Sequence, residues 1–266
     1  MLGSLAKIST FQLLALAFLS VNMKDIEAID DIIEIEEANG GNPVVPRVPR
    51  VRIDPFDLYS NAEFYQRFRM RKNVVRKLIE LIGDDLTTQR LPGSFRVPAA
   101  LHTLAAGCFQ ATTGDVLGVS QSTQSATIRC FLDVLLKHRK SFVYFPRDLR
   151  HVKTKFRELG MAGVIGAVDG THVLIKRPRN DPNSDRYFNR KSQISINTQV
   201  VAGPDLTFYN VVARWPGSTH DSRVFLNSKV HDRLFHTDLK GKGYLLGDKG
   251  YPSLPLFSIV ILFFRS

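Results

Sequence analysis

The chain is poor in the residues that build disulfide frameworks and thiolate metal sites, with only two cysteines, Cys108 and Cys130, among 266 residues. Both lie in apolar segments with helical spacing, so they are expected to be small core residues of a protein from a reducing compartment. The sequence also lacks an uninterrupted apolar run of the roughly 18 residues that a membrane-spanning helix needs. These absences argue against a disulfide-rich scaffold, a cysteine zinc site and a membrane-spanning protein.

The shorter apolar run from Phe11 to Val21 resembles the hydrophobic part of a secretory signal. Only Lys7 precedes it, no small-residue cleavage site follows it, and an acidic stretch comes next. The run is therefore expected to form a helix that packs on the body of the protein. A secreted or membrane-tethered protein is the alternative that this segment leaves open.

Acidic residues are scarce beyond the N-terminal segment. The formal net charge is +11, yet residues 1–46 hold seven acidic and two basic residues. The remainder carries 34 basic and 18 acidic side chains, which is a net charge of +16. Such a body favours a polyanionic partner, DNA above all, because basic side chains that contact phosphates release bound counterions. A basic surface without a nucleic-acid partner would have the same composition.

The composition divides the chain into three regions. Residues 1–53 are expected to form a helix and then an acidic and proline-rich linker. Residues 54–160 show helical spacing of apolar side chains, and residues 161–266 contain apolar runs typical of strands. The expected fold class is therefore α/β, with a helical region followed by a mixed-sheet catalytic domain.

The helical region has recognisable helix starts. The sequence predicts a helix that begins at Ser60 or Asn61, a second over residues 72–82, and a third that begins at Pro98 and has Phe109 on its inward side. All three would bury one apolar face against the others.

Residues 115–138 resemble a helix-turn-helix unit. A short helix leads to a turn at Gly118 and Val119, Ser120 is a suitable N-cap, and a second helix runs to about His138. The second helix is expected to expose side chains able to meet bases or phosphates, namely Gln121, Ser122, Gln124, Ser125 and Arg129. An αα-hairpin that only packs is the alternative interpretation.

Strands are expected over residues 164–169, 173–176, 194–202, 207–214 and 244–247, with a helix over 222–230. Three aspartates stand at the ends of these elements: Asp169 closes the first strand, Asp221 opens the helix, and Asp248 follows the last strand. A carboxylate at the end of a buried strand costs free energy unless its charge is compensated. Oxygen ligands without a cysteine or histidine cluster predict Mg²⁺ or Mn²⁺.

The order of strands and helix matches a ribonuclease-H-like fold. In that fold the first strand is central and the strand after the helix lies beside it, so Asp169 and Asp248 would be neighbours, with Asp221 as an accessory ligand. Two metal ions about 4 Å apart would then serve both halves of phosphodiester cleavage. Trp215 is read mainly as a core anchor, with stacking on a base as the alternative.

Several segments resemble the PIF/Harbinger transposases, and most of all the Harbinger transposase-derived nucleases of animals. The matching segments are 166–172, 189–191, Asn197, 215–223 and 246–252, together with 111–123 upstream. The resemblance implies a divalent-metal-dependent nuclease of the DDE type, with Asp169, Asp221 and Asp248 at metal-binding positions. It also implies DNA as the substrate, a Myb-like DNA-binding partner protein, and the nucleus as location, with the cytoplasm as a second one.

The chain departs from that family after Asp248. The family has a third acid, a glutamate, on a helix well downstream, whereas the 18 residues after Asp248 contain no acid. We therefore expect a C-terminally truncated domain with weakened metal binding and impaired catalysis. The alternative function is a protein that binds DNA or a partner protein without catalysis.

Overall fold

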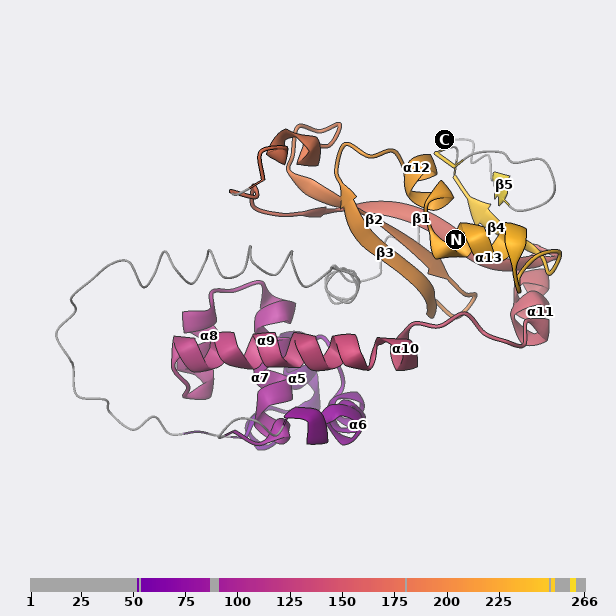
Figure 1. Cartoon of the computed structure of the whole chain (residues 1–266). Helices are drawn as coiled ribbons and strands as arrows, with labels where there is room; N and C mark the ends of the chain where they lie inside the picture. The colour runs from indigo at the N-terminus through magenta and orange to yellow at the C-terminus, as the bar shows by residue number, and fades with distance from the viewer. Residues whose placement is uncertain are drawn as a thin grey trace. The chain divides into compact units, whose positions relative to one another are not determined.

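The computed structural model describes residues 52, 54–86, 91–179, 181–248 and 250–251, and the backbone of 259–261 (Figure 1). The helix and linker expected within residues 1–53 lie almost wholly outside these residues. The chain divides into two compact units, and their described parts meet in sequence between Arg139 and Lys140. We call them the helical unit and the sheet unit. No helix among the described residues is both long and apolar enough to cross a membrane.

The helical unit is arranged around one central helix. Its elements are α4 (Pro55–Leu58), α5 (Asn61–Phe68), α6 (Lys72–Ile82), the 3₁₀ helix η2 (Asp84–Leu86), α7 (Gly93–Ala106), α8 (Gln110–Leu117) and α9 (Gln121–Lys137). Helix α7 packs against α5, α6, α8 and α9. Every residue from Phe95 to His102 is buried, which is the pattern of a helix surrounded on all sides.

Two helix starts in this unit agree with the sequence, and one prediction is wrong. Helix α5 follows Ser60, and α6 has the predicted bounds. Helix α7 begins five residues before Pro98, which lies inside it, because packing on all sides outweighs one missing backbone hydrogen bond. It ends at Ala106, before Phe109, which is 82% exposed and does not face inward.

The start of α5 is held by a reciprocal pair of hydrogen bonds. Glu63 N donates to Ser60 Oγ, and Ser60 N donates to Glu63 Oε2. This capping box satisfies two backbone donors that the helix cannot pair by itself.

We expect Ser60→Ala to lower the free energy of unfolding by about 1 kcal/mol, because one helix-terminal donor loses its acceptor. Urea denaturation of the whole chain measures the change. The control is Ser60→Asp, which keeps an acceptor oxygen and should retain most of the stability. Equal losses in both variants would contradict the capping role.

The sheet unit contains a mixed five-stranded sheet in the order β3-β2-β1-β4-β5. Its elements are α10 (Arg139–Phe142, which starts at the boundary), α11 (Arg150–Glu158), β1 (Val164–Leu174), the 3₁₀ helix η3 (Ser184–Tyr187), β2 (Ser195–Ala202), β3 (Phe208–Pro216), α12 (Asp221–Leu226), α13 (Lys229–His236), β4 (Tyr244–Gly247) and β5 (Ile259–Ile261). Strands β1, β2 and β3 are antiparallel neighbours, whereas β4 runs parallel to both β1 and β5. The predicted central position of the first strand, with the strand after the helices beside it, is confirmed.

Two elements of this unit differ from their predictions. The expected strands over residues 164–169 and 173–176 are one strand, because β1 stays paired with β2 as far as Leu174. The single helix expected over 222–230 is two helices, since α12 ends at Leu226 and Ser228 caps the start of α13.

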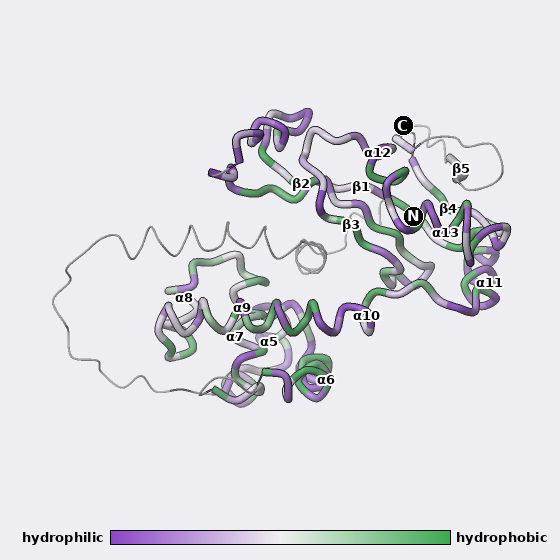
Figure 2. The backbone as a smooth tube through the Cα atoms, viewed as in Figure 1, coloured by the Kyte–Doolittle hydropathy of each residue, from purple (hydrophilic) through white to green (hydrophobic). Residues whose placement is uncertain are grey.

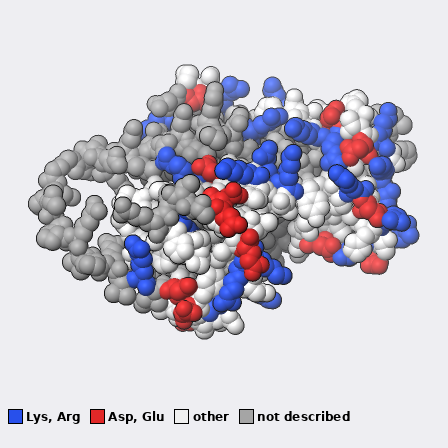
Figure 3. Space-filling model, turned by 60° about the horizontal axis from the view of Figure 1, so that its bottom comes forward, with Lys and Arg blue, Asp and Glu red and all other residues white. Residues whose placement is uncertain are grey.

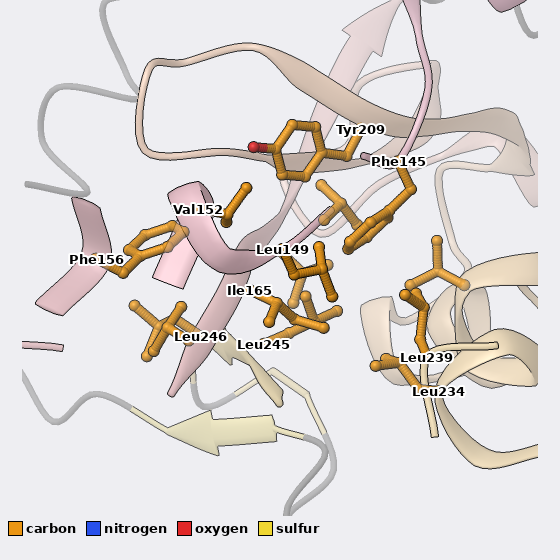
Figure 4. Close-up of a cluster of buried hydrophobic side chains, with 14 of the residues drawn as sticks. Phe145, Leu149, Val152, Phe156, Ile165, Tyr209, Leu234, Leu239, Leu245 and Leu246 are labelled. Carbon is orange, nitrogen blue, oxygen red and sulfur yellow. The ribbon is translucent and has the colours of Figure 1, made fainter. Parts of the chain in front are cut away.

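The core of the sheet unit lies between the sheet and its helices. Figure 4 shows Leu149, Val152 and Phe156, from α11 and the residue before it, beside Ile165 and Leu245 of the sheet. Val164 and Ile165 are adjacent in β1 and both are fully buried, so both faces of the sheet are covered where this strand begins. Figure 2 shows the contrast between these hydrophobic strands and the hydrophilic connection from β1 to β2.

Candidate functional site

The parallel pairing of β1 and β4 brings Asp169 and Asp248 to the same edge of the sheet. Ala167 is the partner of Leu246, and each aspartate lies two residues beyond that pair on its own strand. Strand β4 ends before Asp248, whereas β1 continues past Asp169, which is paired with Val200 of β2. Asp169 therefore lies inside β1 at a point where β4 no longer pairs with it, and Asp169 is exposed there.

Asp221, the first residue of α12, reaches the same place from the helix. Asn197 of β2 holds it, since its Nδ2 donates to Asp221 Oδ1 at 2.7 Å and to the Thr219 carbonyl oxygen at 2.8 Å. Helix α12 packs against β2. The fixed amide thus ties the start of the helix to the strand next to β1.

Two glycines leave room for these carboxylates. A Cβ atom on Gly170 would lie 2.6 Å from Asp221 Oδ1, so Asp221 occupies the space directly over this residue. A Cβ atom on Gly250 would lie 3.0 Å from Asp248 Oδ1 and 3.4 Å from Asp221 Oδ2. The carboxylates of Asp221 and Asp248 therefore border one small volume beside Asp169.

The negative charges of the three aspartates are not balanced by a described Lys or Arg side chain. The pKa of Asp169 is raised, first because surrounding protein atoms displace water from it although part of the side chain remains exposed, and then by the charges of Asp248 and Asp221. A hydrogen bond from the Gly170 backbone N–H to Asp169 Oδ1, 2.8 Å long, acts in the opposite direction. Mutual repulsion of this kind favours a bound cation.

Tyr251 closes the site on the side of the core. Its side chain is buried, and its ring lies edge-on to Phe225 at 5.9 Å. Burial raises the pKa of its hydroxyl, and the charges of Asp221, Asp169 and Asp248 raise it further. The buried hydroxyl has no hydrogen-bond partner among the described residues, so it is available to a ligand atom bound near the carboxylates.

The side chains fit a hard divalent cation in chemistry and charge. They offer carboxylate oxygens, the ligand type that Mg²⁺ and Mn²⁺ prefer. None of the three forms an ion pair with a described Lys or Arg. However, no three or more His, Cys, Asp or Glu side chains in the described part of the chain converge closely enough to hold a metal ion as they stand. The carboxylates are near one another without forming a ready ligand set.

The two histidines that flank these aspartates in sequence have structural contacts. His172 Nδ1 lies 3.1 Å from Ser195 Oγ, and the His220 side chain accepts a hydrogen bond from Ser222 N at the start of α12. Sequence reasoning gave no role to Asn197 or Tyr251. The signal for Asn197 was available, because a polar residue inside a predicted strand must find a partner if it is buried.

In the helical unit, α8, Gly118 and the Ser120 cap of α9 follow the predicted pattern. One predicted contact residue is wrong: Gln124 is fully buried, and its Nε2 donates to the Ala99 carbonyl oxygen at 2.8 Å and to Thr103 Oγ1 at 2.9 Å. It therefore fixes α9 on α7. Ser122 and Arg129 are exposed, and Gln121 and Ser125 are partly exposed.

The segment that holds these aspartates resembles known proteins. Residues 168–263, which contain all three aspartates, match the family described as DDE superfamily endonuclease. Over 210 residues the chain is 36% identical to Putative nuclease HARBI1 of Rattus norvegicus and 34% identical to that of Homo sapiens, and each match covers 75% of this chain and 59% of the relative. Protein ALP1-like of Arabidopsis thaliana is 29% identical over 218 residues, which cover 72% of this chain and 53% of the relative.

No solved structure matches the chain. The chain spans about three fifths of the length of the HARBI1 relatives, 59% in each. The segment that matches the family, residues 168–263, is also the one that contains Asp169, Asp221 and Asp248. The chain is therefore similar to the Harbinger transposase-derived proteins named Putative nuclease HARBI1, and residues 168–263 of its sheet unit match the DDE superfamily endonuclease family.

Proposed function

We propose that this protein is a divalent-metal-dependent nuclease that cleaves DNA phosphodiester bonds, with a ribonuclease-H-like arrangement of its sheet and three aspartates. The observation that carries the proposal is the grouping of Asp169, Asp221 and Asp248, none of which forms an ion pair with a described Lys or Arg. Similarity in sequence supports it, because relatives are named as nucleases.

The three aspartates would hold the metal, and each has one defined constraint. Asp169 and Asp248 each accept a backbone N–H, from Gly170 at 2.8 Å and Gly250 at 2.9 Å, which fixes their orientation. Asp221 is fixed by the Asn197 amide. When bound, two Mg²⁺ or Mn²⁺ ions would supply a hydroxide nucleophile and would stabilise the charge on the leaving oxygen. The carboxylates then need no nucleophilic serine or cysteine beside them.

DNA is the proposed substrate because the body of the protein is strongly basic. Figure 3 shows Lys and Arg side chains at many places on the described surface, with acidic side chains between them. A nuclear location and a Myb-like partner protein, which the resemblance in sequence implies, belong to this proposal.

The test is cleavage of supercoiled plasmid and of a labelled duplex by the whole chain, with Mg²⁺, with Mn²⁺, and with EDTA alone. We expect nicking only with a divalent ion, and restoration when excess Mn²⁺ follows EDTA. A chain in which Asp205, an exposed residue of the β2–β3 turn, is changed to alanine should cut equally well. Cleavage that persists in EDTA would contradict the proposal.

A second candidate function is DNA binding without catalysis, favoured by the exposed Ser122 and Arg129 on α9. Under this alternative the chain binds duplex DNA with a steep salt dependence, and neither divalent ions nor Asp169→Ala changes the affinity or produces nicks.

A further inference from the structure

Two arginine side chains lie near the indole ring of Trp215, which is close to the end of β3. The guanidinium carbon of Arg214 lies 5.7 Å from the ring centroid, and that of Arg223 lies 6.0 Å from it. Both arginines are exposed, and the indole is partly exposed. Cations at such distances are attracted to the negative face of the ring, and tryptophan is the best aromatic partner for them.

Neither arginine has a carboxylate partner in the part of the chain that the structure describes. Other arginines of the sheet unit do form ion pairs, for example Arg177 with Asp185 and Arg233 with Asp238. The Arg214 side chain donates to the Asn227 carbonyl oxygen at 3.2 Å, and neither Arg214 nor Arg223 forms an ion pair with a described acidic residue. Their positive charges therefore remain available to a ligand, and a guanidinium held by a ring can present its N–H groups to phosphate oxygens.

Trp215 and Arg223 are linked through neighbouring residues to Asp221, one of the three aspartates. Trp215 is the strand partner of Asn197, whose amide holds Asp221. Arg223 lies two residues after Asp221 on α12. A DNA strand at the aspartates would be repelled by their charge, so phosphates beside the cleaved bond need positive contacts close by.

The indole nitrogen, which is unpaired within the described ranges, suggests that Trp215 is present for the interaction of its ring face with the arginines. Trp215 Nε1 is buried and has no acceptor among the described residues, which costs free energy. A phenylalanine ring could fill a similar space without burying an unpaired N–H donor. Tryptophan differs from it in attracting the two guanidinium groups more strongly.

We propose that Arg214, Arg223 and Trp215 form a binding site for phosphate groups of the DNA strand that lies beside Asp169, Asp221 and Asp248. The proposal rests on the proposed function for its substrate. It assigns the arginines to phosphate contacts and the indole to holding them in place.

The experiment is DNA binding by fluorescence anisotropy in EDTA, so that metal plays no part. The double variant Arg214→Gln/Arg223→Gln is compared with Arg147→Gln/Arg157→Gln, which removes two exposed arginines elsewhere in the sheet unit. We expect Kd to rise at least ~10-fold in the first, with the salt slope reduced by about two, since each phosphate contact on duplex DNA contributes about 0.9. The control should change Kd less than about twofold and the slope by less than about one. Thermal unfolding verifies that both variants fold.

A second variant separates the ring from the charges. Trp215→Phe keeps an aromatic face and should weaken binding less than Trp215→Ala. The proposal is overturned if the Arg214→Gln/Arg223→Gln chain binds DNA like its control, or if the unaltered chain does not bind DNA.

Cleavage measured in parallel with Mn²⁺ distinguishes the two proposals. A chain that binds DNA through these arginines but never cuts it supports the phosphate site and defeats the nuclease. A chain that cuts only with metal, yet whose binding does not depend on the arginines, overturns the phosphate site alone.

Discussion

Changing Asp169 to asparagine is expected to lower Mn²⁺ affinity and DNA cleavage by more than ~100-fold, because even groups that only orient metal ligands change affinity or activity about 10–100-fold. Asparagine keeps the shape of the side chain and its place in β1 while removing the charge. Mn²⁺ binding is measured by electron paramagnetic resonance of the free ion, and cleavage by nicking of plasmid DNA. Unchanged Mn²⁺ affinity would contradict the assignment of Asp169 as a ligand.

The same substitution should make the metal-free protein slightly more stable. Asp169 is partly exposed, so relief of its repulsion with Asp248 and Asp221 is worth only about 0.5 kcal/mol after solvent screening, or a Tm rise of about 1–2 °C for a chain of this size. The control is Asp205→Asn, which breaks an exposed ion pair with Lys155. It should leave Mn²⁺ affinity unchanged and lower stability slightly. We therefore expect Asp169→Asn to raise the stability of the metal-free protein and Asp205→Asn to lower it.

The pH dependence follows from the raised pKa of Asp169. The folded chain holds this proton more tightly than the unfolded chain does, so the free energy of unfolding of the metal-free protein falls as pH rises from the ordinary value of 3.8 through the raised pKa. Mn²⁺ affinity should rise over the same window, because the ligand must be ionised. Asp169→Asn removes the contribution of this residue to the stability slope, and denaturation at several pH values without metal measures it.

The proximity of Asp169 and Asp248 could be predicted from the sequence because it depends on strand order. An apolar run bounded by glycine identifies each strand, and the bounds of β4 agree with the prediction. Placing the last strand beside the first then brings together two residues 79 positions apart. This prediction requires only the types of the helices and strands and their order along the chain, and the hydrophobic pattern indicates both.

The contacts that complete the site depend on tertiary geometry, which local pattern does not report. Sequence indicated that β1 ends at Asp169, because the apolar run stops there, but pairing with β2 carries the strand to Leu174. Gln124 looked like a surface residue by its polarity, yet it is buried with its amide paired. Asn197 is the same case at the site: its partner Asp221 is 24 residues away and is reached only after α12 packs on β2.

The second large effect is expected from Gly170→Ala. An added Cβ would lie 2.6 Å from Asp221 Oδ1 and 2.8 Å from its Cγ, closer than atoms in proteins pack. The carboxylate must move, and its hydrogen bond with the buried Asn197 amide opposes that movement. Gly170 does not have a positive φ angle, so alanine suits its backbone and the effect is confined to the clash.

We therefore expect Gly170→Ala to lower Mn²⁺ affinity and cleavage about 10–100-fold, as displaced metal ligands do, with a much smaller change in stability. The matched control is Gly93→Ala in α7, also without a positive φ angle, where the nearest atom would be at an ordinary 3.4 Å. It should retain both metal affinity and cleavage. If Gly170→Ala bound Mn²⁺ as tightly as the control, Asp221 would not be a ligand, and Asp169 and Asp248 would have to hold the metal without it.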